Sequence, residues 1–178
     1  MDRRTQVADA ALDVIAAAGM KGLTHRAVDE AADAPTGTTS NYHRTRAALV
    51  AAAVDRLEQR DLAVWASGQQ AAPPVGVDEL AERLAAYLAV FAGEHADLTR
   101  VRLMLSLDQP DAVVAGHVRF VAVARQLVAS AGIADPDLVA LWIADYCDGM
   151  LLHEVTTRRG QPVDVESHRR AIRRLLHD

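Results

Sequence analysis

Residues 35–49 read PTGTTSNYHRTRAAL, and their composition differs from that of the sequence on either side. The flanking segments are rich in Ala, Leu, Val and charged residues, which favour long helices. Residues 36–41 instead contain three threonines, a glycine, a serine and the single asparagine of the chain. β-Branched and short polar side chains weaken a helix interior, because they lose rotamers or compete for backbone hydrogen bonds. The stretch therefore serves a surface function rather than helix stability.

Two short helices with a tight turn between them are predicted around this stretch. Helical periodicity covers residues 25–32, and the sequence DAP then interrupts it. Pro35 suits the first turn of a second short helix over residues 35–42. A longer helix over residues 3–18 precedes both and stops at Gly19. This is the geometry of a helix-turn-helix, whose second helix lies in the major groove of DNA.

The side chains of the second short helix suit contact with DNA. Serine and threonine hydroxyls donate to phosphates or base edges, and an asparagine amide recognises adenine. Arg44 and Arg46 place positive charge where the phosphate backbone would pass. Thr24 and the free amides of the helix that it caps can bind a phosphate on the other side. Each residue alone is explained as well by a polar loop or a helix cap; the combination indicates a DNA-binding face.

The remaining sequence predicts six further helices and no strand. Thr45 is a candidate cap for a long amphipathic helix over residues 45–68. Pro, Gly and Asp signals separate the helices expected over residues 77–93, 94–107, 111–131, 137–159 and 164–176. The predicted fold class is all-α with about nine helices, divided into a helix-turn-helix domain over residues 1–48 and a larger helical bundle over residues 49–178.

Charge and cysteine content limit the classes of function. The chain has 24 acidic and 19 basic residues and a net charge of -5, which argues against a surface with general affinity for nucleic acid. Cys147 is the single cysteine, so neither an internal disulfide nor a cysteine-based zinc site is possible. We expect a soluble cytoplasmic protein, because the sequence shows no signal peptide and no apolar stretch that we judge long enough to span a bilayer.

The sequence contains no motif for catalysis or metal binding. It has no G-x-S-x-G elbow, no P-loop and no G-x-G-x-x-G after a strand. The HEVTT sequence at His153 stops short of the H-E-x-x-H zinc pattern, and the histidines of the larger domain lack a mutual spacing of three or four. We therefore expect a protein that is not an enzyme and that uses no cofactor and no metal.

Residues 4–54 resemble the DNA-binding domain of the TetR family of bacterial transcriptional regulators. That family usually reads G-V-S-x-G-T-L-Y-x-Y-F-x-[ST]-K-x-x-L, and this chain keeps Gly37, Thr38, Tyr42, Thr45 and Leu49 in the same register. Two departures are Asp33, which replaces a turn glycine, and His43, which replaces a Phe and is expected to pack. The resemblance implies phosphate contacts for Thr38, Tyr42 and Arg46, and positions beside the DNA backbone for His25 and Arg26. It implies that Thr36, Thr39, Ser40 and Asn41 face the groove. Thr24 and Gly37 complete the candidate DNA-binding residues.

The same resemblance implies a small-molecule effector that binds among the middle helices. Bulky residues there are explained first as core, because a helical bundle must fill its interior. Three features favour a pocket: an aromatic and methionine series at four-residue spacing, Asp145 and Cys147 near the line of that series, and a histidine and an arginine within apolar helices. The candidate ligand-binding residues are Trp65, Tyr87, Phe91, Arg102, Met104, His117, Phe120, Trp142, Tyr146 and Met150.

The helix expected over residues 137–159 is apolar on more than one side along residues 138–155, although a surface helix needs only one apolar stripe. We expect one side to pack internally and another to contact a partner subunit; the resemblance implies a homodimer through the last two helices. The chain is thus interpreted as a ligand-responsive regulator, most simply a repressor that releases a near-palindromic operator when its effector binds. Two alternatives stay open: a helical small-molecule-binding protein or enzyme with a vestigial DNA-binding domain, and a DNA-binding protein without an effector.

Overall fold

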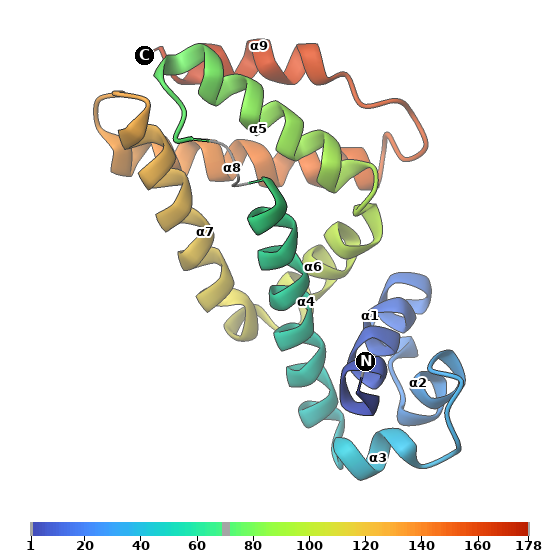
Figure 1. Ribbon diagram of the computed structural model, residues 1–178. Coiled ribbons are helices and arrows are strands. Elements are labelled where there is room, and N and C mark those ends of the chain that lie inside the picture. The colour runs from blue at the N-terminus through green and yellow to red at the C-terminus, as the bar shows by residue number, and fades with distance from the viewer. Residues whose placement is uncertain (1, 69–71, 178) are drawn as a thin grey trace. The chain divides into compact units, whose positions relative to one another are not determined.

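The computed structural model describes residues 2–68 and 72–177, and within these ranges it contains nine α-helices and no strand (Figure 1). The all-α prediction is confirmed. The helices are α1 (Arg3–Gly22), α2 (His25–Ala31), α3 (Thr38–Tyr42), α4 (Arg46–Gly68), α5 (Gly76–Ala92), α6 (Ala96–Asp108), α7 (Pro110–Ser130), α8 (Pro136–Val155) and α9 (Val165–Leu175).

Two compact units form within the chain. Unit 1 comprises Met1–Gln70 and Arg100–Val114, and unit 2 comprises Ala71–Thr99 and Ala115–Asp178. Unit 1 therefore holds the helix-turn-helix with α4 and most of α6, while unit 2 holds α5, most of α7, α8 and α9. The boundary that we place after residue 48 concerns function, and it stays a prediction.

Local signals set the ends of the helices in unit 1. The carboxylate of Asp2 accepts a hydrogen bond from the amide of Thr5 at 2.8 Å and caps α1. Gly19, with φ of 69°, interrupts the helical path at the predicted stop, because glycine enters the left-handed region without steric cost. Thr45 accepts from the amide of Ala48 at 3.1 Å and so caps α4, as expected. Pro35 lies in the turn before α3, which is shorter than predicted.

Arginines tie the longer helices of unit 1 together. Arg56 of α4 forms a bidentate ion pair with Asp9 of α1, with N–O distances of 2.8 and 2.9 Å. Arg102 of α6 pairs in the same way with Asp61 of α4, at 3.2 and 2.5 Å. The guanidinium of Arg100 also donates to the carbonyl oxygen of Ala16 in α1. Two-point contacts of this kind fix orientation as well as distance.

Unit 2 is built around α5, which packs against α9 and α8. Its inward side chains, including Leu84, Leu88 and Phe91, are buried. The buried hydroxyl of Thr99 donates to the carbonyl oxygen of Phe91 at 2.7 Å. This bond supplies a partner for a carbonyl in the last turn of α5, where intrahelical donors run out. Helix α8 ends at Val155 rather than at residue 159, because Thr156 leaves the helical region with φ of -120° and ψ of -88°.

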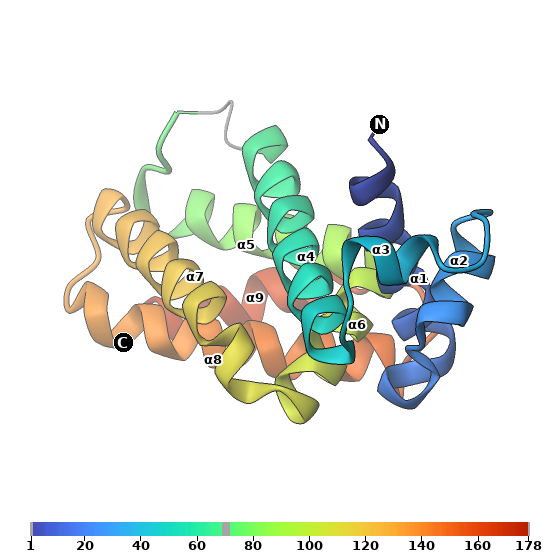
Figure 2. The same cartoon turned by 90° about the horizontal axis from the view of Figure 1, so that it is seen from below.

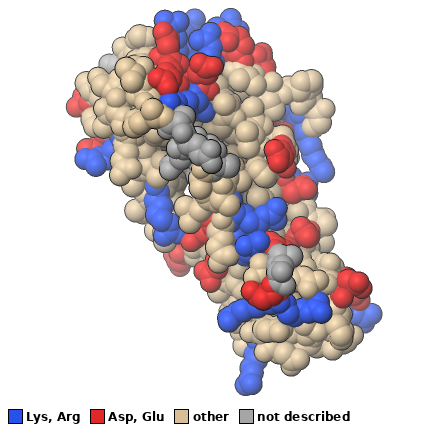
Figure 3. All heavy atoms as spheres, in the orientation of Figure 1, with Lys and Arg blue, Asp and Glu red and all other residues tan. Residues whose placement is uncertain are grey.

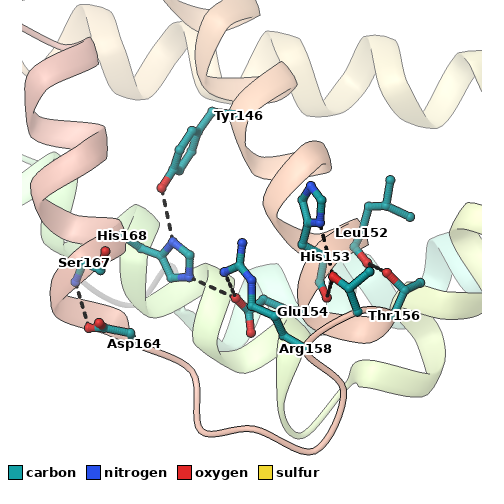
Figure 4. A network of polar contacts seen from close by, with 10 residues as sticks. Tyr146, Leu152, His153, Glu154, Thr156, Arg158, Asp164, Ser167 and His168 are labelled. Carbon is teal, nitrogen blue, oxygen red and sulfur yellow. Dashed lines mark hydrogen bonds and ion pairs between the residues drawn. The ribbon is translucent and has the colours of Figure 1, made fainter.

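A buried polar chain joins α8 to α9 (Figure 4). The phenol oxygen of Tyr146 lies 3.1 Å from Nδ1 of His168, and Nε2 of His168 lies 3.5 Å from a carboxylate oxygen of Glu154. Glu154 in turn accepts from Arg158 at 2.6 Å. Burial raises the pKa of the Tyr146 phenol, so this group is a neutral hydrogen-bonding partner at physiological pH.

We expect Tyr146→Phe to lower the free energy of unfolding by about 1 kcal/mol, because the ring still fills its space while Nδ1 of buried His168 loses its partner. Urea unfolding followed by circular dichroism measures this difference. The matched control is Tyr42→Phe, whose phenol belongs to an exposed side chain in unit 1. Equal losses in the two variants would contradict a structural role for the contact between Tyr146 and His168.

Helix α7 corrects one expectation from the sequence. By length and composition α7 is long and apolar enough to cross a membrane. From the sequence, no stretch of this kind was expected. A single helix of this kind is weak support for a membrane span, because length and composition alone do not separate it from helices of soluble proteins. In this structure α7 also carries Arg125, which forms an ion pair with Asp137 of α8, and it exposes Val114 and Val118.

Candidate nucleic-acid interface

The turn between α2 and α3 depends on two residues with left-handed backbone. Asp33 has φ of 47° and Gly37 has φ of 91°. The aspartate in place of a turn glycine is therefore accommodated, since Asp tolerates this region better than most residues with a Cβ. Gly37 directly precedes α3 and occupies its N-cap position, so the direction of the recognition helix is set at that residue.

Asp29 braces this turn from inside. Its two carboxylate oxygens accept hydrogen bonds from the amide of Gly37 at 2.7 Å, the amide of Thr39 at 2.7 Å and the Thr39 hydroxyl at 2.6 Å. Burial by itself raises the pKa of Asp29, but the hydrogen bonds from Thr39 and Gly37 outweigh it and hold the pKa below the ordinary value. An ionised, buried carboxylate thus fixes α3 against α2.

Thr39 was expected to face the DNA groove, and this expectation is wrong. The side chain is completely buried, and its hydroxyl donates to Asp29. Thr36, Ser40 and Asn41 are exposed, as their expected positions at the groove require. The sequence could not separate these residues, because all of them are short and polar.

The phosphate-contact candidates on α3 are accessible. Tyr42 has 45% of its surface exposed, at the end of the helix. The Thr38 hydroxyl donates to the carbonyl oxygen of Pro35 at 2.6 Å, and the Ser40 hydroxyl donates to that of Gly37 at 3.0 Å. Each hydroxyl oxygen keeps its capacity to accept a further hydrogen bond. The recognition helix thus presents short hydroxyl and amide groups, with a phenol at its end.

The start of α2 and the start of α4 hold the remaining candidates. The Thr24 hydroxyl accepts from the amide of Ala27 at 3.1 Å, so Thr24 is the expected helix cap. Nε2 of His25 lies 2.6 Å from the carbonyl oxygen of His43, which ties α2 to the end of α3. Arg46 donates to the carbonyl oxygen of Met20 at 2.6 Å. His43 itself is buried, in agreement with the packing role expected for it.

Arg26 is exposed and forms an ion pair within α2. Its guanidinium lies 2.9 Å from the carboxylate of Glu30, one helical turn away on α2. Such exposed pairs contribute little free energy, so this one can exchange for a phosphate at small cost. Glu30 also places a negative charge near any phosphate bound there, which makes Arg26 a weaker candidate than Arg46.

Solved structures show what this fold resembles, whereas no protein-family model and no curated protein matches the sequence. A TetR-family member from Streptomyces coelicolor A3 has a TM-score of 0.78 at 24% identity, with 100% of both chains covered. The multidrug binding protein EbrR, solved with imidazole, has a TM-score of 0.72 at 26% identity over 100% of this chain and 95% of its own. EbrR solved with proflavin has a TM-score of 0.66 at 27% identity over 98% and 99%.

The chain has the fold of TetR-family regulators. In this fold α1–α3 form the helix-turn-helix domain, and α3 takes the place of the recognition helix. Unit 2 contains most of the helices in which the sequence places an effector.

Three of the ligand-binding candidates of this chain come together in unit 2. The Tyr87 ring lies 4.5 Å from that of Phe91 and 6.0 Å from that of Phe120, centroid to centroid. His95, which the sequence did not single out, lies 5.8 Å from Phe91. The spacing of Tyr87 and Phe91 by one turn of α5 was the signal available in the sequence, whereas His95 lies in the turn that follows α5. We call Tyr87, Phe91 and Phe120 the aromatic cluster.

The other ligand-binding candidates do not join the aromatic cluster through any contact that we observe. Arg102 is committed to Asp61 within unit 1, and Met104 also belongs to unit 1. Trp142 and His117 are exposed, while Tyr146 contacts His168 and Met150 is half-buried. The side chain of Trp65 lies outside the described residues. Within residues 2–68 and 72–177, no group of three His, Cys, Asp or Glu side chains could hold a metal ion.

The single cysteine of this chain is expected to be chemically inert in the native state. Cys147 is fully buried, and burial raises the pKa of its thiol to about 12. The reactive thiolate is therefore scarce at neutral pH. Native protein should resist iodoacetamide at pH 7 to 8 and react only after unfolding in urea, as mass spectrometry can measure. Rapid alkylation of native protein would contradict the buried position.

Proposed function

We propose that this chain is a ligand-responsive transcriptional regulator that binds a near-palindromic operator as a homodimer and leaves it when a small molecule binds. The observation that carries the proposal is the recognition helix. Asp29 braces α3 from within, so that Ser40, Asn41 and Tyr42 point outward from a rigid element. Short hydroxyl and amide groups read base edges at close approach, and a phenol at the helix end suits a phosphate.

Selection of random duplex DNA at physiological salt tests this function, because that salt suppresses unspecific phosphate binding. We expect a palindrome whose half-sites are separated by one helical turn, about 34–36 Å. Asn41→Ala should relax the preference at one position in each half-site, and Tyr42→Phe should weaken all sequences alike. Gln59→Ala, at an exposed position on α4, is the control. Recovery of no motif by protein that has been stripped of small molecules by unfolding and refolding would contradict DNA recognition.

We infer that the effector is a planar aromatic molecule. Tyr87 and Phe120 are half-buried beside the fully buried Phe91 in unit 2, and stacked or tilted rings bind other aromatic groups favourably. EbrR, which this chain resembles in structure, has been solved with proflavin. Proflavin fluorescence is therefore the probe: Phe120→Ala should weaken its binding at least about tenfold, and Leu107→Ala, at an exposed position in unit 1, should not.

Release of DNA requires that effector and operator weaken each other's binding. By thermodynamic linkage the two factors are equal, so proflavin affinity should fall in the presence of the selected operator. A reporter gene placed behind that operator in cytoplasmic expression tests repression. Equal proflavin affinities with and without operator would contradict release, and would favour a regulator without an effector.

The proposed homodimer rests on the outer face of α8. Leu138, Leu141, Trp142 and Leu152 are exposed, while Val139, Ile143, Cys147 and Leu151 of the same helix are buried. A helix apolar on both sides needs a second apolar surface to cover it. Asp145 on this outer face and the exposed Arg170 and Arg174 of α9 carry opposite charges, which a two-fold axis can bring together between two copies. The occupant of the face is therefore a second copy of this chain.

A further inference from the structure

The first turn of α1 carries two arginines that the core does not need. Arg3 and Arg4 are exposed and precede Val7, the first buried residue of the helix. Arg3 donates to the neutral amide of Gln6 at 2.8 Å. For Arg4, no acidic partner is found among the described residues. We call these two residues the first-turn arginines.

Contacts within unit 1 place the first-turn arginines beside the recognition helix. The amide of Gln6 donates to the carbonyl oxygen of Ala32 at 2.8 Å, which fixes the first turn of α1 at the end of α2. Ala32 directly precedes the turn that leads to α3. In two perpendicular views the start of α1 lies close to α3 (Figures 1 and 2). Burial lowers the pKa of His43, and after burial the largest cause is the charge of Arg4, which therefore acts at the far end of α3.

The surface around them carries both signs of charge. Figure 3 shows Lys and Arg side chains over the α1–α3 region, with Asp and Glu side chains among them. Three acidic residues near them already have partners: Asp2 caps α1, Asp29 accepts hydrogen bonds from the turn before α3, and Glu30 pairs with Arg26. Asp33 is exposed in the turn itself. The exposed Arg44 follows α3 directly and adds a further cation.

The recognition helix itself, TTSNY, contains no cation. At least half of the hydrogen bonds in protein–DNA complexes go to phosphate and sugar, so flanking elements must supply the charge that holds α3 in the groove. The planar guanidinium of arginine matches the oxygens of a phosphate. We propose that Arg3 and Arg4 bind the sugar–phosphate backbone of duplex DNA beside the recognition helix. This inference rests on the proposed DNA-binding function.

The test is the salt dependence of binding to a fluorescently labelled duplex of mixed sequence, which requires no knowledge of the operator. Each phosphate neutralised contributes about 0.9 to the slope of log Kobs against log salt. In a dimer each copy contributes two arginines, so Arg3→Gln/Arg4→Gln removes four phosphate contacts and should make this slope shallower by about 3.6. Arg3→Lys/Arg4→Lys should keep most of it, because the charge remains. The matched control is Arg159→Gln/Arg173→Gln, which removes two exposed arginines from unit 2.

A second readout separates these arginines from residues that read bases. The glutamine variant should weaken binding to the selected operator and to the mixed duplex by the same factor, whereas Asn41→Ala should weaken the operator alone. Unchanged thermal melting confirms that the variant folds. A wild-type slope in Arg3→Gln/Arg4→Gln would overturn the inference while the proposed function stands. Wild-type protein without salt-dependent binding to any duplex would overturn both.

Discussion

Asp29→Asn should lower the free energy of unfolding by about 2–3 kcal/mol and abolish binding to DNA. The carboxylate accepts from three donors: the Gly37 amide at 2.7 Å, the Thr39 amide at 2.7 Å and the Thr39 hydroxyl at 2.6 Å. An asparagine has one oxygen in place of two, and its NH2 group would face an amide N–H that also donates. A buried donor without an acceptor loses its full hydration energy, and the charge-assisted bonds are the stronger kind.

A matched control lies four residues away. Asp33→Asn makes the same chemical change at an exposed residue with φ of 47°, a conformation that Asn tolerates as well as Asp. We expect its midpoint in urea to stay within the range of an ordinary surface substitution, about 0.5 kcal/mol. Both variants are compared by circular dichroism and by anisotropy on duplex DNA. Similar midpoints for Asp29→Asn and Asp33→Asn would refute the role of Asp29 as the brace of α3.

The same contact predicts a dependence on pH with a definite sign. Hydrogen bonds hold the pKa of Asp29 below its ordinary value of 3.8 despite burial. A depressed pKa contributes stability that is fully present above the unfolded-state value and is lost as the pH falls through the folded-state value. The difference in unfolding free energy between wild type and Asp29→Asn should therefore be constant above pH of about 5 and shrink below 3.8. A difference that is unchanged in acid would exclude an ionised Asp29.

The sequence allowed accurate prediction of the helices because their ends carry local signals. Thr24 and Thr45 cap α2 and α4, and Gly19 interrupts the helical path within α1, as their residue types indicated. Each of these signals acts over three or four residues, so no tertiary information is needed to interpret it. The end of α8 was placed too late, since Thr156 leaves the helix within a stretch that has no Gly or Pro before Gly160.

The direction of individual side chains was predictable only in part. Helix α3 has five residues, fewer than two turns, and no apolar stripe marks its inner side. The burial of Thr39 follows from Asp29, ten residues earlier, and periodicity does not reveal such a pairing. Four-residue spacing also misled the prediction in α8. Each step of four rotates a helix position by about 40°, so Trp142 is exposed while Met150 is half-buried.

Leu141→Glu should convert the proposed dimer into a monomer. Leu141 lies on the outer face of α8 with Leu138 and Leu152, at positions that repeat with the three-and-four spacing of helix–helix seams. A two-fold axis places the substituted residue in the interface twice. Burying an unpaired carboxylate at an apolar contact costs several kcal/mol, so dissociation should become at least about 100-fold easier.

Sedimentation velocity across a concentration series measures this change. The matched control is Leu107→Glu on α6, where the leucine is 89% exposed and the new charge stays in water. Asp145→Arg and Arg174→Asp test the charge pairing in the same assay: each alone should weaken the dimer, and a mixture of the two should form heterodimers. A dimer that survives Leu141→Glu would place the interface elsewhere, and the exposed Val114 and Val118 of α7 would then be the next surface to alter.

Loss of the dimer should act on DNA binding far more than on the fold. Leu141 projects away from the buried side of α8, so its replacement leaves Ile143 and Cys147 packed as before. Each monomer keeps an intact α3 but binds one half-site only, and the gain from linking two half-sites is commonly 10²–10⁴-fold, roughly 3–5 kcal/mol. Leu141→Glu should therefore bind a single half-site with wild-type affinity while losing its preference for the full palindrome. If Leu141→Glu lowered the affinity for the single half-site and for the full palindrome by the same factor, α8 would affect the recognition helix in a way other than dimerisation.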